Sequence, residues 1–186
     1  FSFFGNETIT TGEGGMVVSN NKAYIERVSS LKNQGASKNK YWYEEVGYNY
    51  RMTNICAAIG LSQVEKVESI LERKKEIANL YEEKLKECPL DFQKIQSNGL
   101  SSYWLVSILT KDKDIRDDLS NFLNKSGVET RPLFYPAHTM PMFNSEGSFP
   151  VALDLSVRGL NLPSFPDLTN DDVSQICTYI KEFFSN

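Results

Sequence analysis

The sequence is poor in the residues that build metal sites and disulfides. It has one histidine, His138, and three cysteines, Cys56, Cys88 and Cys177, which lie far apart and form no CxxC pair. A structural zinc site needs ligands paired at short spacing, so we expect no metal site. Three dispersed cysteines also make no disulfide framework and indicate a reducing compartment, the cytoplasm.

Two further absences narrow the class of protein. No apolar run is long enough to cross a membrane and no signal peptide is visible, so we expect no membrane span. Lysine and arginine (20) do not outnumber aspartate and glutamate (24), and no basic stripe occurs, which argues against a nucleic-acid partner. The 186 residues, 40% of them hydrophobic, suit one ordinary globular domain or one and a half small ones.

The chain opens on an apolar run, Phe1 to Phe4, without an initiator methionine. A free terminus is usually polar and poorly ordered. We therefore expect a chain that starts inside a domain, and the alternative is a processed N-terminus.

The first half predicts loops and helices with one short strand. We expect a loop over 1–13, a strand over 14–19 and a helix over 22–34 that Asn20–Asn21 caps and Gly35 ends. A long polar and aromatic loop follows, and loops of that length inside a domain are usually functional. Thr53 caps the next helix, whose apolar rhythm continues to about residue 87.

The pattern changes after Pro89. The expected elements are a strand over 102–110, a helix from 115 to 127, a strand over 128–131, a loop over 132–149, and a last helix that Thr169 and Asp172 cap. We therefore divide this mixed α/β chain into residues 1–88 and a small α+β domain over 89–186. The strand over 14–19 lacks a partner strand, so we expect its open edge to be covered by a binding partner or by self-association.

Four blocks of sequence are more specific than these predicted elements, because together they point to one family. They are FSFFGNETITTGEGGMVVSN, GYNYRMTNICAAIGLSQVEK, ETRPLFYPAHTMP and RGLNLPSFPDLT, in this order along nearly the whole chain. Together they resemble the DegT/DnrJ/EryC1/StrS family of nucleotide-sugar aminotransferases, which use pyridoxal phosphate (PLP), and most closely its perosamine synthase branch, which aminates a GDP-linked 4-keto-6-deoxy sugar. The resemblance implies the C-terminal part of a PLP fold type I aminotransferase, with the end of the large PLP-binding domain in 1–88 and the small domain in 89–186.

The resemblance places the family's catalytic lysine at position 7, where this chain has Glu7. In the family that lysine forms a Schiff base with PLP, and glutamate donates the amino group that passes to the sugar. A carboxylate cannot form an imine and puts negative charge beside an anionic cofactor. We therefore expect this chain not to transaminate. In the family a further N-terminal half supplies most of the large sheet and other PLP contacts.

Two more positions are implied to bind the cofactor. Ser2 matches the serine that hydrogen-bonds the PLP phosphate, and otherwise it is a turn hydroxyl. Asn49, inside GYNYRM, matches an asparagine that reaches the phosphate in the partner subunit's site, which implies a homodimer. Its alternative role is to satisfy its own loop backbone.

The substrate candidates lie in the third block. The family places its YPxH loop beside the sugar nucleotide, which makes Tyr135 and His138 candidates, although a lone histidine is often only packed or exposed. Arg131 either contacts a substrate phosphate or pairs with a carboxylate such as Glu129.

Two other functions remain open for this sequence. One is a non-catalytic binding or regulatory homologue that keeps the fold. The other is the family's dehydratase branch, which replaces the same lysine by histidine because it still needs a proton carrier near neutral pH. Glu7 would serve as a base there only if it were desolvated.

Overall fold

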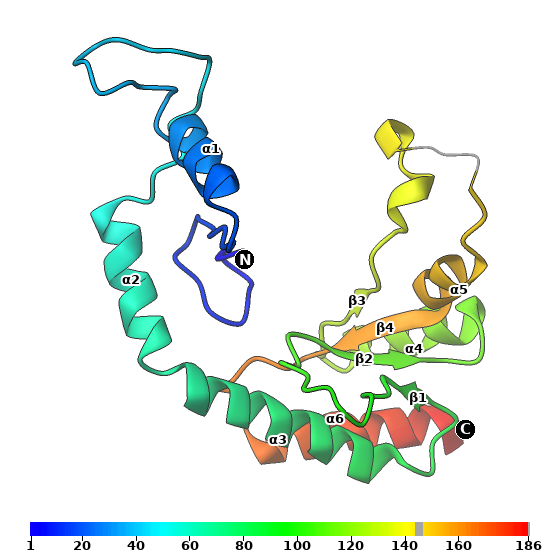
Figure 1. Cartoon of the computed structure of the whole chain (residues 1–186). Coiled ribbons are helices and arrows are strands. Elements are labelled where there is room, and N and C mark those ends of the chain that lie inside the picture. Colours follow the sequence, from blue (N-terminus) through cyan, green and yellow to red (C-terminus); the bar gives the residue numbers. More distant parts are fainter. Residues whose placement is uncertain (144–146, 186) are drawn as a thin grey trace. The chain divides into compact units, whose positions relative to one another are not determined.

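The structure, a computed structural model, describes residues 1–143 and 147–185 (Figure 1). The chain forms two compact units that divide between Glu68 and Ser69. The sequence placed the division near residue 88 instead. Helix α3 (Val67–Leu85) lies almost wholly in the second unit because Ile77, Tyr81 and Leu85 are buried in the core of that unit.

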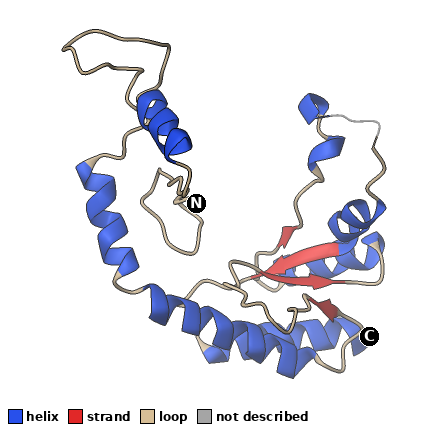
Figure 2. Ribbon diagram, in the orientation of Figure 1, coloured by secondary structure: helices blue, strands red, loops and turns tan. Residues whose placement is uncertain are grey.

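The first unit consists of two helices and two long loops (Figure 2). The predicted helix over 22–34 is confirmed as α1 (Lys22–Lys32), and the Asn21 side chain accepts a hydrogen bond from the Ala23 amide at 3.0 Å. Gly35 follows its end with a positive φ of 69°, and its amide donates to the Ser30 carbonyl. Glycine takes this left-handed conformation without steric cost, which explains the end of the helix.

The predicted strand over 14–19 is wrong. Only Gly15 forms a β-bridge, with Ser2, and the next three residues, Met16, Val17 and Val18, are 46%, 60% and 61% exposed. A strand needs a neighbouring strand to take its hydrogen bonds, and the described part of the first unit offers none beyond this bridge.

The predicted continuous helix from Thr53 to about residue 87 is two helices. The Thr53 hydroxyl caps α2 (Asn54–Val64) as predicted, by accepting from the Cys56 amide at 3.3 Å. The α-helical bonding ends at Glu65 and Lys66, where the Lys66 amide donates to the Gln63 carbonyl three residues earlier. Helix α3 begins after this turn. The apolar rhythm hides this break because apolar positions on both sides of it keep helical spacing, although the helices belong to different units.

The second unit contains a four-stranded antiparallel sheet in the order β1-β2-β4-β3. The strands are β1 (Asp91–Phe92), β2 (Val106–Leu109), β3 (Arg131–Pro132) and β4 (Gly159–Leu162). The unit's other helices are α4 (Lys113–Lys125), α5 (Pro150–Arg158) and α6 (Asn170–Ser185). Helices α3 and α6 run side by side along the sheet (Figure 1), and Arg73 in α3 donates to Asn170 at the start of α6.

The sequence located most of these elements but missed three, namely β1, β4 and α5. The strand expected over 128–131 lies at Arg131–Pro132, on the sheet edge, where a proline that lacks an N–H is tolerated. Strand β1 has only two residues, and β4 is four buried residues without alternation, so neither gives a periodic signal. The expected loop over 132–149 contains two short 3-10 helices, η1 (Ala137–Thr139) and η2 (Pro141–Phe143), and its residues 144–146 lie outside the described residues.

One core joins the sheet to three of the helices. The Thr169–Asp172 cap predicted for the last helix is confirmed, since each backbone amide donates to the other residue's side chain at 3.0–3.1 Å. The core comprises Ile77, Ala78, Tyr81, Leu85, Val106, Ile108, Leu119, Leu123, Leu160, Leu162, Leu168, Val173, Ile176, Cys177 and Ile180.

Polar side chains of α3 hold the segment over 163–168, which follows β4. The Lys74 ammonium donates to the Ser164 carbonyl at 2.8 Å and the Tyr81 hydroxyl donates to the Pro163 carbonyl at 3.0 Å. Arg73 donates to the carbonyls of Pro166 and Leu168. Lys74 is buried, and burial lowers the pKa of its ammonium group. These bonds satisfy carbonyls of an irregular segment that would otherwise need water.

In the described part of the chain, no helix combines the length and the apolar character that crossing a membrane requires.

Replacing Tyr81 by phenylalanine should lower the free energy of unfolding by about 1–2 kcal/mol, because the Pro163 carbonyl loses its buried donor. Chemical denaturation measures this change. The matched control is Tyr24→Phe, whose ring is 64% exposed and whose hydroxyl removal should leave stability unchanged. Equal stability of wild type and Tyr81→Phe would contradict the hydrogen bond's contribution.

Cys177 should resist alkylation in the folded protein. Its side chain is 1% exposed, and burial raises the pKa of its thiol to about 11, so the reactive thiolate is scarce. Mass spectrometry after iodoacetamide treatment at mildly alkaline pH should find Cys177 modified only with denaturant. Half-buried Cys56 provides the internal control and should react in the native protein. Native labelling of Cys177 at the rate of Cys56 would be the contrary result.

Candidate functional site

Residues 1–16 form a closed loop that carries Ser2 and Glu7. The Phe1 backbone nitrogen donates to the Met16 carbonyl at 2.7 Å, and the Met16 amide donates back to the Phe1 carbonyl at 2.9 Å. Further in, the Phe3 amide donates to the Gly14 carbonyl at 3.0 Å. These paired bonds fix the two ends of the loop side by side.

Glu7 lies at a turn in this loop. Its amide donates to the Phe4 carbonyl at 3.1 Å, which closes a four-residue turn, and its side chain is half-buried. The exposed Ser2 hydroxyl accepts from the Phe4 amide at 3.4 Å. This is the turn role that the sequence allowed for Ser2, and it leaves the hydroxyl proton available to a phosphate.

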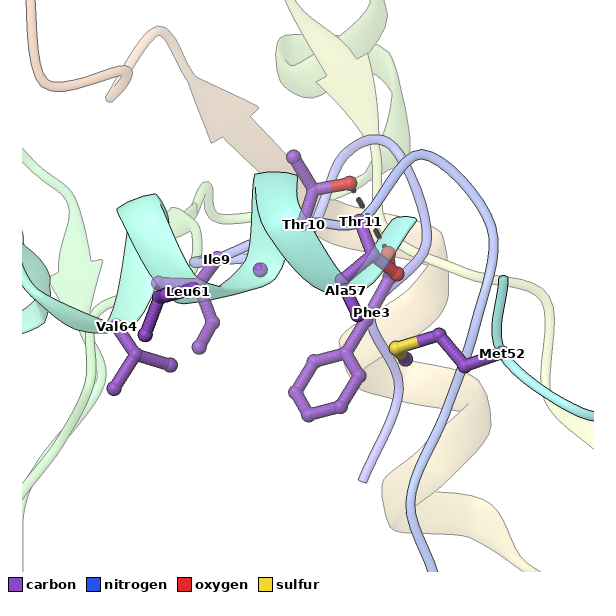
Figure 3. Close-up of a pocket in the computed structure, with 9 residues that line it drawn as sticks. Phe3, Ile9, Thr10, Thr11, Met52, Ala57, Leu61 and Val64 are labelled. Carbon is purple, nitrogen blue, oxygen red and sulfur yellow. Dashed lines mark hydrogen bonds between the residues drawn. The ribbon is translucent and has the colours of Figure 1, made fainter. Parts of the chain in front are cut away.

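A pocket of about 230 Å³ lies between this loop and α2 (Figure 3). The hydroxyl groups of Thr10 and Thr11 in its lining already donate hydrogen bonds to backbone carbonyls. Thr10 donates to Phe3 at 3.0 Å and Thr11 donates to Glu13 at 2.7 Å. The pocket suits an apolar group rather than a phosphate, because hydrocarbon dominates its lining. The lining residues are Phe3, Ile9, Thr10, Thr11, Met52, Ala57, Gly60, Leu61 and Val64.

Asn49 lies at the base of the second loop, which spans 33–50. The Tyr48 amide donates to the Leu31 carbonyl at 2.6 Å, and the rings of Tyr48 and Tyr50 stack with centroids 4.9 Å apart. Asn49 itself is exposed and forms a β-bridge with Asn33. Its backbone is therefore held beside the end of α1, while the residue stays exposed.

Glu45 ties the same loop to α1. The Ser30 hydroxyl donates to its carboxylate at 2.6 Å, and the Arg27 guanidinium pairs with it. The hydrogen bonds from Ser30 and Arg27 hold the pKa of Glu45 below its ordinary value. A side chain at Gly35 would overlap the Glu45 backbone, so this close approach requires a glycine.

The three predicted substrate residues lie in the second unit, on β3 and the stretch that follows it. Glu129 accepts from Nε and Nη2 of exposed Arg131, at 3.3 Å each, as the sequence allowed. Tyr135 is 77% exposed, and half-buried His138 in η1 tilts against the Phe149 ring with centroids 4.7 Å apart. Sequence reasoning missed one neighbour, the stack of Trp104 on Phe134, because stacking between distant residues leaves no local signal.

The predicted cofactor residues and the predicted substrate residues therefore fall into two groups. Ser2 and Glu7 share one closed loop of the first unit, with Asn49 on the other loop of that unit, whereas Arg131, Tyr135 and His138 share one stretch of the second unit.

The residues at position 7 and around it do not fit covalently bound PLP. A Schiff base needs a primary amine, and residues 1–21 contain no lysine. The side chain at the turn is a carboxylate, which repels an anionic phosphate. Among the described residues, no group of three or more histidine, cysteine, aspartate or glutamate side chains converges on a metal position.

The model of the DegT/DnrJ/EryC1/StrS aminotransferase family matches residues 1–181. The chain belongs to this family. It is 50% identical over its whole length to a GDP-perosamine synthase of Escherichia coli O157:H7 and 48% identical to one of Vibrio cholerae. The chain spans about half of each relative, 51% and 52% of their lengths.

Solved structures share the fold. The aminotransferase TlmJ from Streptoalloteichus hindustanus superposes over 99% of the chain with a TM-score of 0.92, at 24% identity, and the match covers 51% of TlmJ. DesV of S. venezuelae, solved with a ketimine intermediate, covers 100% of the chain with a TM-score of 0.88, at 26% identity and over 51% of DesV. The prediction of an α/β chain with the fold of part of a PLP aminotransferase is confirmed.

Replacing Glu45 by glutamine should loosen the loop over 33–50. The lowered pKa means that the carboxylate stabilises the fold above its ordinary pKa, and that this stabilisation is lost as the pH falls through the lowered pKa. Hydrogen exchange at the Gln34 and Tyr48 amides should be faster in Glu45→Gln near neutral pH, and equal to wild type in acid. Exposed Glu44→Gln is the matched control. Unchanged protection in Glu45→Gln at neutral pH would show that the pair does not hold the loop.

Proposed function

We propose that the protein containing this chain has the architecture of a nucleotide-sugar aminotransferase. Such an enzyme transfers an amino group from glutamate to a GDP-linked 4-keto-6-deoxy sugar. The supporting observations are the four ordered sequence blocks and the 50% identity to a GDP-perosamine synthase. The homodimer implied by Asn49 and a cytoplasmic location, in keeping with free Cys56, Cys88 and Cys177, belong to the same proposal.

The chain with Glu7 does not carry out transamination. The observation that carries this conclusion is the closed loop over 1–16, which holds a carboxylate at its turn and contains no lysine. Because the amine is the reacting group, no other property of the loop replaces it.

The remaining residues keep roles in binding and orientation. The exposed Ser2 hydroxyl can donate to a phosphate, and Asn49 offers its amide from the surface of the second loop to a site on a partner subunit. Arg131, oriented by Glu129, attracts the diphosphate, while Tyr135 and His138 offer hydrogen bonds to the sugar.

Glu7 also favours a second candidate function, a non-catalytic homologue that binds sugar nucleotides without converting them. The dehydratase alternative has less support. Its proton carrier would have to be desolvated, and Glu7 is only half-buried in its loop.

Incubation of the full-length gene product with PLP, followed by borohydride, should leave no cofactor attached to the peptide that contains Glu7. Borohydride fixes an imine as a stable bond, and a carboxylate forms none. Mass spectrometry of peptides reads the result. Covalent PLP on another lysine of the wild-type protein would overturn this account of position 7.

The matched variant is Glu7→Lys in the same full-length protein. It should bind PLP covalently at residue 7 and transfer an amino group from glutamate to a GDP-linked 4-keto-6-deoxy sugar. Glu13→Lys, on the same loop, adds an identical charge and amine elsewhere and should do neither. An inactive Glu7→Lys that still binds the sugar nucleotide would favour the non-catalytic function.

A further inference from the structure

Two aromatic rings from distant segments stack on the surface of the second unit. The Trp104 and Phe134 centroids lie 5.9 Å apart with an angle of 14° between the ring planes. Phe134 is nevertheless 66% exposed. The stack with Trp104 therefore leaves most of the Phe134 side chain accessible to solvent.

The position of Trp104 is set by a left-handed turn just before it. Tyr103 has a φ of 46°, rare for a bulky residue, and its amide donates to the Ser101 hydroxyl at 3.1 Å. Tyr103 packs against the core of the second unit, whereas the next residue, Trp104, is not among the residues of that core. Such conformations cost free energy and cluster at functional sites.

The position of Phe134 is set by the residue before it in the chain, Leu133. The Leu133 amide donates to the Gly159 carbonyl at 3.3 Å, and its side chain lies directly over Gly159. A Cβ at Gly159 would overlap Leu133 and lie 2.6 Å from the Leu155 carbonyl. Leu133 is therefore anchored on β4, whereas the next residue, Phe134, stays exposed.

An exposed aromatic ring suits a flat, uncharged ring such as a nucleobase, since every base has a π-face to stack. Arg131 lies three residues before Phe134, about 10 Å along an extended chain, a distance that a ribose and its phosphates can bridge. Glu129 offsets part of the Arg131 charge, so phosphate attraction there is modest and stacking has to contribute much of the affinity.

We propose that the stacked pair Trp104–Phe134 is the surface on which the base of the nucleotide-linked sugar stacks. This inference rests on the proposed function, because it assigns one part of the same substrate. Phe134 contacts the base, and Trp104 is a positioning residue that supports the Phe134 ring from behind.

The test is a titration of the full-length protein with GDP, read by tryptophan fluorescence. The chain has two tryptophans, so Trp42→Phe, at a 64% exposed position, makes Trp104 the chain's single emitter. In the full-length protein, tryptophans outside this chain are replaced likewise. GDP should quench this emission, and a sugar 1-phosphate without a base, such as mannose 1-phosphate, should not.

Phe134→Ala should weaken GDP binding about tenfold, the effect of losing one stacked base contact. Phe134→Tyr keeps the ring and should retain wild-type affinity. Phe165→Ala is the matched control, because Phe165 is another exposed aromatic residue of the same unit that takes no part in the stack. Binding of mannose 1-phosphate should not change in any of these variants.

Different results would contradict the stacking surface alone or the nucleotide-sugar function as well. Wild-type GDP binding that Phe134→Ala leaves unchanged would overturn the stacking surface while the nucleotide-sugar function stands. Equal losses in Phe134→Ala and Phe165→Ala would overturn it too, as a general effect of removing surface rings. No binding of GDP by the wild-type protein would overturn the proposed function and the stacking surface together.

Discussion

Burial of one face of α3 is the constraint on which the second unit depends. Ile77, Tyr81 and Leu85 enter the core with the sheet, and polar residues of the same helix donate to carbonyls of the segment over 163–168. The helix therefore supplies both apolar burial and hydrogen bonds to an irregular segment. Because that segment leads from β4 into α6, its attachment fixes where the last helix begins.

The first unit is held in a different way, by backbone pairing and a few close polar contacts. Its helices bury no residue completely, and Ile55 and Leu61 of α2 are 76% and 63% exposed. Hydrogen bonds close the loop over 1–16, and Glu45 with Ser30 closes the second loop. These contacts present Glu7 at one turn and Asn49 at the base of the other loop.

The backbone of the loop that carries Glu7 does not depend on the side chain at that position. The turn that carries Glu7 is closed by backbone bonds, from the Glu7 amide to the Phe4 carbonyl and between Phe3 and Gly14. None of these bonds uses the side chain of residue 7. The chemistry of the side chain at position 7 can therefore differ while these backbone bonds stay the same.

The family, the capped helix starts at Asn21, Thr53 and Thr169, and the candidate residues can all be predicted from the sequence, because caps and family blocks are local patterns. Which apolar segments pair with a neighbouring strand becomes clear only from the folded chain. The run at 16–18 reads as a strand but has no strand beside it, whereas short β4, which carries no alternation, is the central partner of β2 and β3. The same holds for the Trp104–Phe134 stack, since its rings meet only after β4 anchors Leu133 through contact at Gly159. Pairing and stacking join residues that are distant in sequence, and a pattern read along the chain does not contain those contacts.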